Sequence, residues 1–343
     1  MIVRAKNFAL KSEEITKEKV SMLPKNDTEK KALQIIYDWN TGMANFHFNT
    51  SGSTGKSRKI SISREQIVYS TEATFAYIAP ADTIRSSLLC IDPGFIGGAM
   101  VVFRAIIKAL DLFITEPSLN PIASVPGGEN FDLVSMVPLQ LEKLSKKDLS
   151  RVSIILVGGA SFNDESLDLP ANTRVFSTYG MTETVSHIAL RKTGDPVFHT
   201  TGDTTVKTDA NGCLSIKGSI TQNNWLKTND LARVLSPHEF ELIGRKDFII
   251  NSGGIKINPE EIEKKLSKQI RYPFVVSSKP DKRLGEKLVL IVATANEKPD
   301  FDFSFLHKYE KPKEVIYWDK VIKTKSGKID RHAIRKLLHS HSP

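Results

Sequence analysis

The chain has 343 residues, a formal net charge of +9 at pH 7 and two cysteines, Cys90 and Cys213. Its length exceeds one ordinary hydrophobic core and predicts two units, one large and one small. The cysteines lie far apart in no metal-ligand spacing, so the sequence indicates neither a disulfide framework nor a zinc site. We expect a soluble protein of the reducing cytoplasm.

The charge pattern favours small anionic ligands over nucleic acid and membranes. Lysines are dispersed, and no basic helix is interleaved with the aromatic residues on which single-stranded nucleic acids stack. Most lysines are expected to be solvated surface, and nucleotide phosphates are the simpler partner. The N-terminus has no signal-peptide core, and four charged residues within the apolar stretch 90–114 argue against a membrane span.

The first half of the chain predicts alternating helices and strands. A capping box formed by Ser63 and Gln66 marks the start of a helix that runs to about Tyr77. Apolar strands alternating with helices predict a buried, largely parallel sheet. Strands are expected at 45–49, 58–62, 86–91, 112–117, 132–137, 152–159 and 174–180, with helices at 29–39, 97–110 and 138–144.

Beyond His187 the pattern changes to short alternating strands with tight turns, which is typical of antiparallel hairpins. A helix then starts at Pro259 with Asn258 as its N-cap. Strands are expected at 274–278, 287–295 and 314–318, and a last helix at 329–338. We expect an α/β protein with a large N-terminal domain, 1–245, of mixed and parallel sheet flanked by helices plus an antiparallel region, and a small α+β domain, 246–343.

The loop TSGSTGKSRK, residues 50–59, looks like a P-loop but does not have its spacing. The Walker pattern requires a glycine where the chain has Thr50, so a P-loop NTPase is not expected. Backbone N–H groups, hydroxyls and the Lys56 ammonium could still bind phosphate oxygens. An ordinary Gly/Ser hairpin turn is the alternative for this loop taken alone.

Four further motifs follow in order: STYGMTE at 177–183, TND at 228–230, GRKDFIINSGGIKINPEEIE at 244–263 and KTKSGKIDR at 323–331. With the loop at 50–59, they resemble the adenylate-forming superfamily of acyl-CoA synthetases, nonribosomal-peptide adenylation domains and luciferases. The resemblance implies an enzyme that uses ATP and Mg²⁺, with a mobile C-terminal domain. Since only 49 residues precede Thr50, a shortened N-terminal subdomain is expected.

The resemblance implies roles for individual residues. Lys328 would place its ammonium between the acyl carboxylate and the α-phosphate and offset their repulsion in the transition state. Thr182 would form a hydrogen bond with the α-phosphate, and the hard carboxylate of Glu183 suits Mg²⁺. The other residues implied at ATP or AMP are Thr50, Ser51, Gly52, Ser53, Thr54, Gly55, Lys56, Gly158, Gly159, Ala160, Tyr179, Gly180, Asp230 and Arg245.

Within this set Tyr179 would lie against the adenine, although a tyrosine at a strand end is more often core. Asp230 would accept from both ribose hydroxyls, as an acceptor-only carboxylate can. The chain has Asn229 where T-G-D is common; since asparagine tolerates the left-handed conformation, we expect the turn to survive. Glu183 as a plain surface residue and Lys328 as one more tail lysine are the alternatives.

The same resemblance places a hinge at Asp247. Rotation about it would withdraw Lys328 and bring the loop of Ser252, Gly253 and Gly254 to the acyl-adenylate. The glycines would leave room there for the pantetheine of coenzyme A.

Within the superfamily, MVPLQLE at 136–142, YGMTETVSHIALR at 179–191 and NSGGIKINPEEIE at 251–263 are similar to 2-succinylbenzoate–CoA ligases of menaquinone biosynthesis, particularly the short bacterial form. This implies an acid with two carboxylates, one activated and one recognised. Arg104 can pair bidentately with the second, unless it lies on a solvent face of its helix. The softer candidates are Gln140, Ser186 and His187.

Other interpretations stay open. The enzyme could adenylate another aryl or fatty acid, or load a carrier protein. A noncatalytic sensor of ATP or an acyl-adenylate is the alternative of another class, and the presence of Lys328, Glu183 and Asp230 argues against it. Nucleic-acid binding and membrane insertion are not expected, and the sequence does not indicate an oligomeric state.

Overall fold

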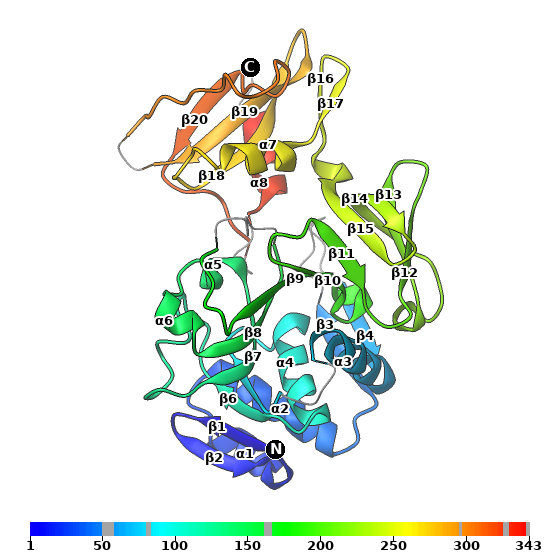
Figure 1. Ribbon diagram of the computed structural model, residues 1–343, viewed down its shortest axis with the longest axis vertical. Coiled ribbons are helices and arrows are strands. Elements are labelled where there is room, and N and C mark those ends of the chain that lie inside the picture. Colours follow the sequence, from blue (N-terminus) through cyan, green and yellow to red (C-terminus); the bar gives the residue numbers. More distant parts are fainter. Residues whose placement is uncertain (50–57, 80–83, 161–166, 295–296, 325–328, 341–343) are drawn as a thin grey trace.

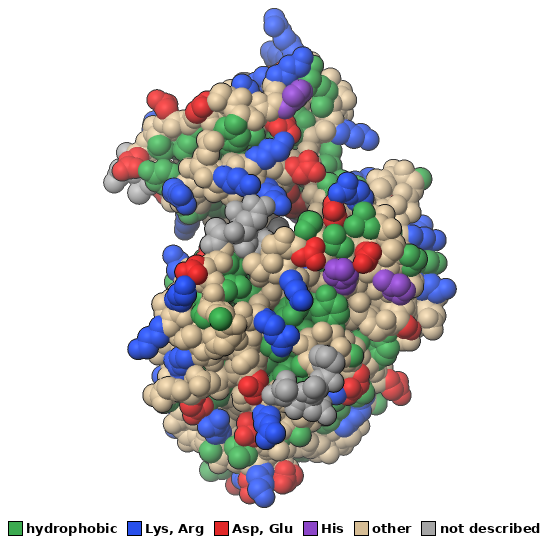
Figure 2. Space-filling model, viewed as in Figure 1, with side chains coloured by type: hydrophobic (Ala, Val, Ile, Leu, Met, Phe, Trp, Pro, Cys, Tyr) green, Lys and Arg blue, Asp and Glu red, His purple; other side chains and the backbone are tan. Residues whose placement is uncertain are grey.

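The computed structural model describes residues 1–49, 58–79, 84–160, 167–294, 297–324 and 329–340. These residues form two lobes of unequal size, each built on its own sheet (Figure 1). On the face seen in Figure 2, lysine and arginine side chains are spread over both lobes and do not gather in one patch. No helix within the described ranges is long and apolar enough to cross a membrane.

The large lobe is organised around a sheet of thirteen described strands, in the order β12-β13-β14-β15-β11-β10-β9-β8-β7-β5-β6-β1-β2. Its strands from β9 to β1 in that order pair in parallel, as predicted. Because β6 and β7 lie on opposite sides of β5, the chain reverses at β5, and ligands bind at the carboxyl ends of strands near such switch points. The parallel strands are β1 (Ile2–Ala5), β5 (Ser86–Leu89), β6 (Asp111–Ile114), β7 (Phe131–Met136), β8 (Val152–Val157) and β9 (Arg174–Gly180).

The predicted antiparallel region continues this sheet beyond β9. Its strands are β10 (His187–Lys192), β11 (Val197–Thr200), β12 (Thr205–Thr208), β13 (Cys213–Lys217), β14 (Leu226–Ser236) and β15 (Glu239–Arg245); β2 (Phe8–Lys11) pairs antiparallel at the opposite edge. A separate hairpin pairs β3 (Asn45–Asn49) with β4 (Lys59–Ser63).

Helices cover both faces of the parallel strands. Leu33, Phe75 and Val102 bring α2, α3 and α4 onto one face, and Leu141 and Leu149 bring α5 and α6 onto the other. The Ser63–Gln66 capping box is confirmed, with both of its reciprocal hydrogen bonds present. The helices are α1 (Lys17–Met22), α2 (Asp27–Asn40), α3 (Arg64–Ile78), α4 (Ile96–Ile107), α5 (Pro138–Leu141) and α6 (Lys146–Leu149), with 3₁₀ turns η1 (Ser12–Glu14), η2 (Thr182–Thr184), η3 (Ser219–Thr221) and η4 (Lys246–Phe248).

The small lobe contains a five-stranded sheet between two helices. Alternate residues of β18 and β19 face opposite helices: Val276 and Leu290 pack with Ile262 of α7, while Val275 and Ile291 pack with Ile334 of α8. Its elements are β16 (Ile250–Ser252), β17 (Ile255–Ile257), α7 (Pro259–Leu266), β18 (Phe274–Asp281), β19 (Gly285–Ala293), β20 (Glu314–Trp318) and α8 (Arg331–Ser340).

The predicted α/β class, with its parallel sheet and antiparallel region, is confirmed. The predicted division at residues 245 and 246 stays a prediction; the small sheet begins at Ile250. Sequence patterns did not predict β1, β2 or α1, because these elements are short and β1 pairs with β6, far along the chain.

Candidate active site

Two predicted motifs meet at the carboxyl edge of the parallel strands. Gly158 and Gly159 follow the end of β8, and STYGMTE spans the end of β9 and the turn η2. A Cβ atom on Gly158 would lie 2.5 Å from Thr178 Oγ1 on the neighbouring strand, so a side chain there would force the Thr178 side chain to move. All strands of a parallel sheet end at one edge, and this brings the two motifs together.

The turn between β9 and β10 is tight and strained. A Cβ on Gly180 would lie 2.1 Å from the carbonyl oxygen of Ser186. Val185 has a φ of 65° and ψ of −54°, and Ser186 N donates to Thr184 O at 2.6 Å around it. This is the γ-turn geometry that β-branched residues rarely adopt, and such strain is concentrated at functional sites.

This hairpin also carries two predicted catalytic residues. Thr182 and Glu183 lie in η2, and the Glu183 side chain is exposed. Among the described residues, no ion pair involves Glu183 and no cluster of three or more potential metal ligands occurs. One exposed carboxylate fits Mg²⁺, which usually takes one or two protein carboxylates together with phosphate and water oxygens.

Arg104 is buried on the inner side of this hairpin. Its residue is 3% exposed, and its Nη2 donates to Ser186 Oγ at 3.1 Å. Its Nε is buried with no hydrogen-bond partner, and within the described residues no carboxylate lies at ion-pair distance. The alternative of a solvent-facing Arg104 is therefore wrong. Burial lowers the pKa of Arg104 to about 10, which leaves the guanidinium charged at neutral pH.

His187 lies beside Arg104 and is neutral. Burial, with the Arg104 charge, lowers its pKa well below the usual range. Its Nε2 lies 2.9 Å from Thr74 Oγ1, whose single proton is donated to Ser70 O. We assign the ring proton to Nε2 for this reason, which leaves Nδ1 as an acceptor. We call Arg104, Ser186, His187 and Thr74 the Arg104 cluster.

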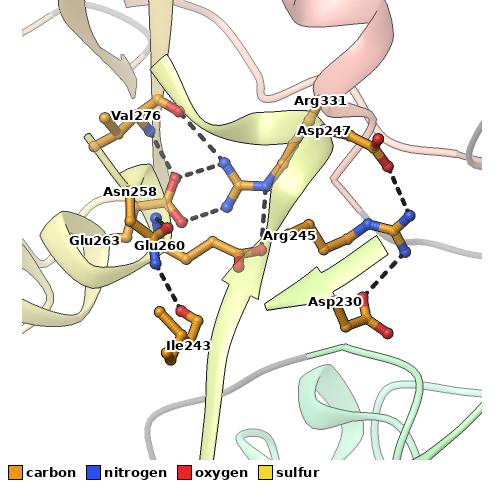
Figure 3. Close-up of polar contacts among 9 residues, drawn as sticks. All are labelled: Asp230, Ile243, Arg245, Asp247, Asn258, Glu260, Glu263, Val276 and Arg331. Carbon is orange, nitrogen blue, oxygen red and sulfur yellow. Dashed lines mark hydrogen bonds and ion pairs between the residues drawn. The ribbon is translucent and has the colours of Figure 1, made fainter. Parts of the chain in front are cut away.

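Asp230 is held by two other predicted residues. Tyr179 Oη donates to Asp230 Oδ2 at 2.6 Å. On the other carboxylate oxygen, Arg245 Nη1 lies 3.5 Å from Asp230 Oδ1, as Figure 3 shows. Burial and then the Asp230 charge raise the pKa of Tyr179 well above its usual value, so Tyr179 stays a donor. Its ring packs edge-on against Phe198 and Phe240, so the structure places Tyr179 largely in the core.

The structure corrects the expectation for Asn229. This residue lies within β14 and is absent from the described non-glycine residues with positive φ, so the position needs no left-handed conformation. Its side-chain amide instead donates to both carboxylate oxygens of Asp247, at 3.1 and 3.2 Å. Arg245 Nη2 reaches the same carboxylate at 2.9 Å. Asp247, the predicted hinge, is thus held from β14 and β15.

Gln140 does not join the Arg104 cluster. Its amide nitrogen donates to Cys90 O and Ser118 O, at 2.9 and 3.0 Å, and its oxygen accepts from Val137 N. These contacts tie together the segments that follow β5, β6 and β7. Both donor hydrogens are used, so the acid-binding role of Gln140 stays a prediction that these contacts do not support.

The predicted coenzyme A loop forms the turn of a hairpin. Gly253 and Gly254 connect β16 to β17 with φ values of 62° and 82°. Two positive φ values define the type I′ turn, in which side chains cost free energy. Turn geometry therefore accounts for the glycines, and their role toward coenzyme A stays a prediction.

Several predicted residues lie outside the described residues: Thr50, Ser51, Gly52, Ser53, Thr54, Gly55, Lys56 and Lys328. Sequence reasoning also missed Thr74, although buried polar residues interrupt the apolar face of α3 at Ser70, Thr71 and Thr74. That interruption was a usable signal. In the sequence Arg331 stands out only as the last residue of KTKSGKIDR. Its role could not be predicted there, because its contacts are with residues far away in the sequence.

Comparison with known proteins places the chain in a family. A model of the AMP-binding enzyme family matches residues 11–211, more than half of the chain. The 2-succinylbenzoate–CoA ligase of Listeria monocytogenes is 26% identical over 355 residues, which cover 92% of this chain and 74% of the relative.

Solved structures agree. An acyl-CoA synthetase (AMP-forming)/AMP-acid ligase II-like protein from Dyadobacter fermentans is 30% identical, with a TM-score of 0.57 and coverage of 92% of this chain and 95% of that chain. The O-succinylbenzoate coenzyme A synthetase of Bacillus subtilis, solved with ATP and magnesium ion, has a TM-score of 0.71 at 21% identity over 83% of this chain and 68% of that chain, which shows a shared fold. The chain therefore belongs to the AMP-binding enzyme family and is an adenylate-forming enzyme of the acid–thiol ligase class.

Proposed function

We propose that the protein is a 2-succinylbenzoate–CoA ligase. In the first step a carboxylate oxygen of the acid attacks the α-phosphorus of ATP, and pyrophosphate leaves with the electron pair of the broken bond. In the second step the coenzyme A thiol, after loss of its proton, attacks the acyl carbonyl and AMP leaves. The products are 2-succinylbenzoyl-CoA, AMP and pyrophosphate.

The observation that carries this proposal is the buried Arg104, which pairs with no carboxylate among the residues that the structure describes. A buried charge costs free energy unless an opposite charge accompanies it. Nη2 contacts only the neutral Ser186 hydroxyl among the described side chains, Nε has no partner, and the neighbouring His187 is neutral. An acid with a second carboxylate would supply the missing charge, whereas a fatty acid or benzoate would not.

The position of this cluster supports the same conclusion. Ser186 directly precedes β10 and His187 is its first residue, and β10 is the returning strand of the hairpin whose turn carries Thr182 and Glu183. An acid held at Arg104 by one carboxylate would therefore lie against the segment proposed to bind the α-phosphate. Binding energy from the second carboxylate would then orient the reacting one.

The nucleotide roles are part of the proposal. Asp230, oriented by Tyr179 and Arg245, would accept from the ribose hydroxyls. Glu183 would hold Mg²⁺, which when bound neutralises phosphate charge. Lys328 would stabilise the charge that develops between carboxylate and α-phosphate. The loop from Thr50 to Lys56 would bind phosphate oxygens, and Gly158 to Ala160 would lie against the adenine. Asp247 would be the hinge whose rotation later brings the loop Ser252 to Gly254 to the acyl-adenylate, where its glycines leave room for the pantetheine of coenzyme A.

The test is thioester formation with ATP, Mg²⁺ and coenzyme A, comparing 2-succinylbenzoate with benzoate and a medium-chain fatty acid. We expect selective product with 2-succinylbenzoate. Equal or better turnover of the monocarboxylates would contradict the proposed acid. Acid-dependent pyrophosphate exchange without any thioester would retain adenylation and direct the search for the acceptor to carrier proteins. No exchange with any acid would contradict the enzymatic proposal as a whole.

A further inference from the structure

The residues on either side of segment 325–328 are held together. Lys323 and Ile329 form an antiparallel bridge, and Asp330 N donates to Ile322 O at 2.9 Å. The segment itself lies outside the described residues, but both of its ends are fixed to each other. In the sequence Lys328 directly precedes Ile329, so the described bridge is one residue along the chain from the proposed catalytic lysine.

The first turn of α8 is fastened directly after this bridge. Asp330 caps the helix, since its Oδ1 accepts from Ala333 N at 2.9 Å. Arg331, the first residue of α8, turns its side chain toward α7 (Figure 3). Its Nη1 donates to Glu263 Oε1 at 3.0 Å and to Val276 O at 3.3 Å, and its Nη2 pairs with Glu263 Oε2. Its Nε lies 3.9 Å from Glu260 Oε1.

The acidic partners are fixed as well. Glu263 Oε1 accepts from Val276 N at 2.7 Å, so α7, β18 and α8 share one carboxylate. The Arg331 side chain is 14% exposed and that of Glu263 is 17% exposed. Although burial opposes the charge of Arg331, the charge of Glu263 raises its pKa above the usual value. We call Arg331, Glu260 and Glu263 the Arg331 network.

Apolar packing also holds α8 on the sheet, independently of this network. Ile334 and Leu338 pack α8 against Val275, Val289 and Ile291, and this apolar contact supplies the main packing energy. Buried ion pairs contribute little net stability compared with apolar side chains of similar volume. Two fork contacts to one fixed carboxylate do restrict geometry, because a guanidinium binds a carboxylate in one plane.

We propose that Arg331 is a positioning residue for the proposed catalytic step of Lys328: its ion pair with Glu263 holds the first turn of α8 beside the Lys323–Ile329 bridge, one residue along the chain from Lys328. The inference rests on the proposed function, in which Lys328 acts in adenylation and is withdrawn before thioester formation. A shift of about 1 Å in a positioning group can cost about 100-fold in rate. Loss of the anchor therefore slows the first half-reaction and not the second.

The test compares Arg331→Lys with Lys265→Ala. Lysine keeps the charge but cannot make the fork contact. Lys265 lies on the same helix as Glu263 and pairs with Glu310 at 2.6 Å, away from α8, so its variant is a matched control for loss of an ion pair on α7. A double variant, Arg331→Met with Glu263→Leu, removes both members of the fork pair together, leaves Glu260 with Arg245 as its remaining basic neighbour, and covers the case in which a single variant folds poorly.

Each variant is assayed for acid-dependent pyrophosphate exchange and for thioester formation from supplied acyl-adenylate and coenzyme A. For Arg331→Lys and the double variant we expect the kcat of exchange to fall roughly 10- to 100-fold. The KM for ATP and the thioester half-reaction should stay within about twofold of wild type, as should both half-reactions of Lys265→Ala.

Two results would overturn the positioning role. One is wild-type exchange in folded Arg331→Lys and in the double variant. The other is an equal loss in both half-reactions, which a merely structural role produces. If wild-type protein shows no exchange with any acid, the proposed function fails first and takes this inference with it, so the two failures are distinguishable.

Discussion

The Arg104 cluster contains a buried arginine and the Arg331 network a largely buried one, and the two arginines differ in what surrounds them. Arg331 meets Glu263 through two fork contacts, with Glu260 nearby. Within the described part of the chain, Arg104 meets one hydroxyl and a neutral histidine, and its Nε has no hydrogen-bond partner. Because a buried charge must be balanced, the paired arginine fits the positioning role that we propose for it, and the unpaired arginine fits our proposal that the acid supplies its anion.

Arg104→Met is expected to have the largest effect. Methionine fits a similar space without charge. We expect kcat/KM for 2-succinylbenzoate to fall roughly 150-fold, which corresponds to about 3 kcal/mol of lost transition-state stabilisation, as for loss of one partner of a buried charge pair. The free energy of unfolding should rise by about 1 to 3 kcal/mol, because an unbalanced buried charge is removed. Steady-state thioester assays and denaturant unfolding measure the two effects.

Benzoate is the internal control for Arg104→Met, since it lacks the second carboxylate. Its slower turnover should change by less than about threefold, because Arg104 would have no partner on this acid in either protein. Equal losses with the two acids would mean that Arg104 supports the fold of the site and does not recognise a carboxylate.

Tyr179→Phe is expected to have the next largest effect. It concerns the charge of Asp230, which the protein's own side chains stabilise. The variant removes the donor 2.6 Å from Asp230 Oδ2. A hydrogen bond to a charged group is worth about 1.5 to 3 kcal/mol, so we expect the KM for ATP to rise at least about tenfold while the KM for the acid is unchanged. Pyrophosphate exchange against ATP concentration measures this.

Tyr69→Phe is the matched control, because Tyr69 also bonds an aspartate, Asp203, which lies outside the predicted nucleotide residues. Its KM for ATP should stay near the wild-type value. A similar rise in both variants would show that tyrosine–aspartate bonds act only through general stability.

Local signals predicted the elements well. The Ser63–Gln66 box and the alternation of apolar strands with helices depend on neighbours in sequence, and both are found in the structure. The order of motifs also led to the family. In both cases, residues close together in the sequence contain the whole physical cause of the local helix or strand.

Long-range contacts could not be predicted. Eight consecutive residues of α4, Gly98–Ala105, are buried, so the apolar pattern around Arg104 could not tell which side faces the core. The full engagement of Gln140 depends on three strand ends that meet only in the fold. The expectation of a left-handed Asn229 was wrong because an extended strand, not a turn, occupies that position.

His187 gives a smaller and pH-dependent test of the Arg104 cluster. Burial and Arg104 hold its pKa well below 6.5, so below that pH the unfolded chain binds a proton that the folded protein does not. The free energy of unfolding should therefore fall as the pH drops below about 6.5, by up to about 1.4 kcal/mol per unit from this residue. Denaturant unfolding at pH 7.5, 6.5 and 5.5 should show a shallower fall in His187→Gln; equal slopes would contradict a buried neutral His187.

Asn229→Ala is expected to have the smallest effect, because its contacts, unlike those of Arg104 and Tyr179, are exposed to solvent. Asn229 is exposed, and its bonds to Asp247 at 3.1 and 3.2 Å compete with water. Arg245 still holds the Asp247 carboxylate at 2.9 Å, and Arg335 holds its carbonyl at 3.2 Å. We expect the free energy of unfolding to fall by about 0.5 kcal/mol and both half-reactions to stay within about twofold. A change of more than about fivefold confined to the thioester half-reaction would have another meaning: Asn229, where T-G-D is common, would set the equilibrium between two orientations of the small domain about the proposed hinge. A contact too weak to affect stability can still bias two orientations of similar free energy.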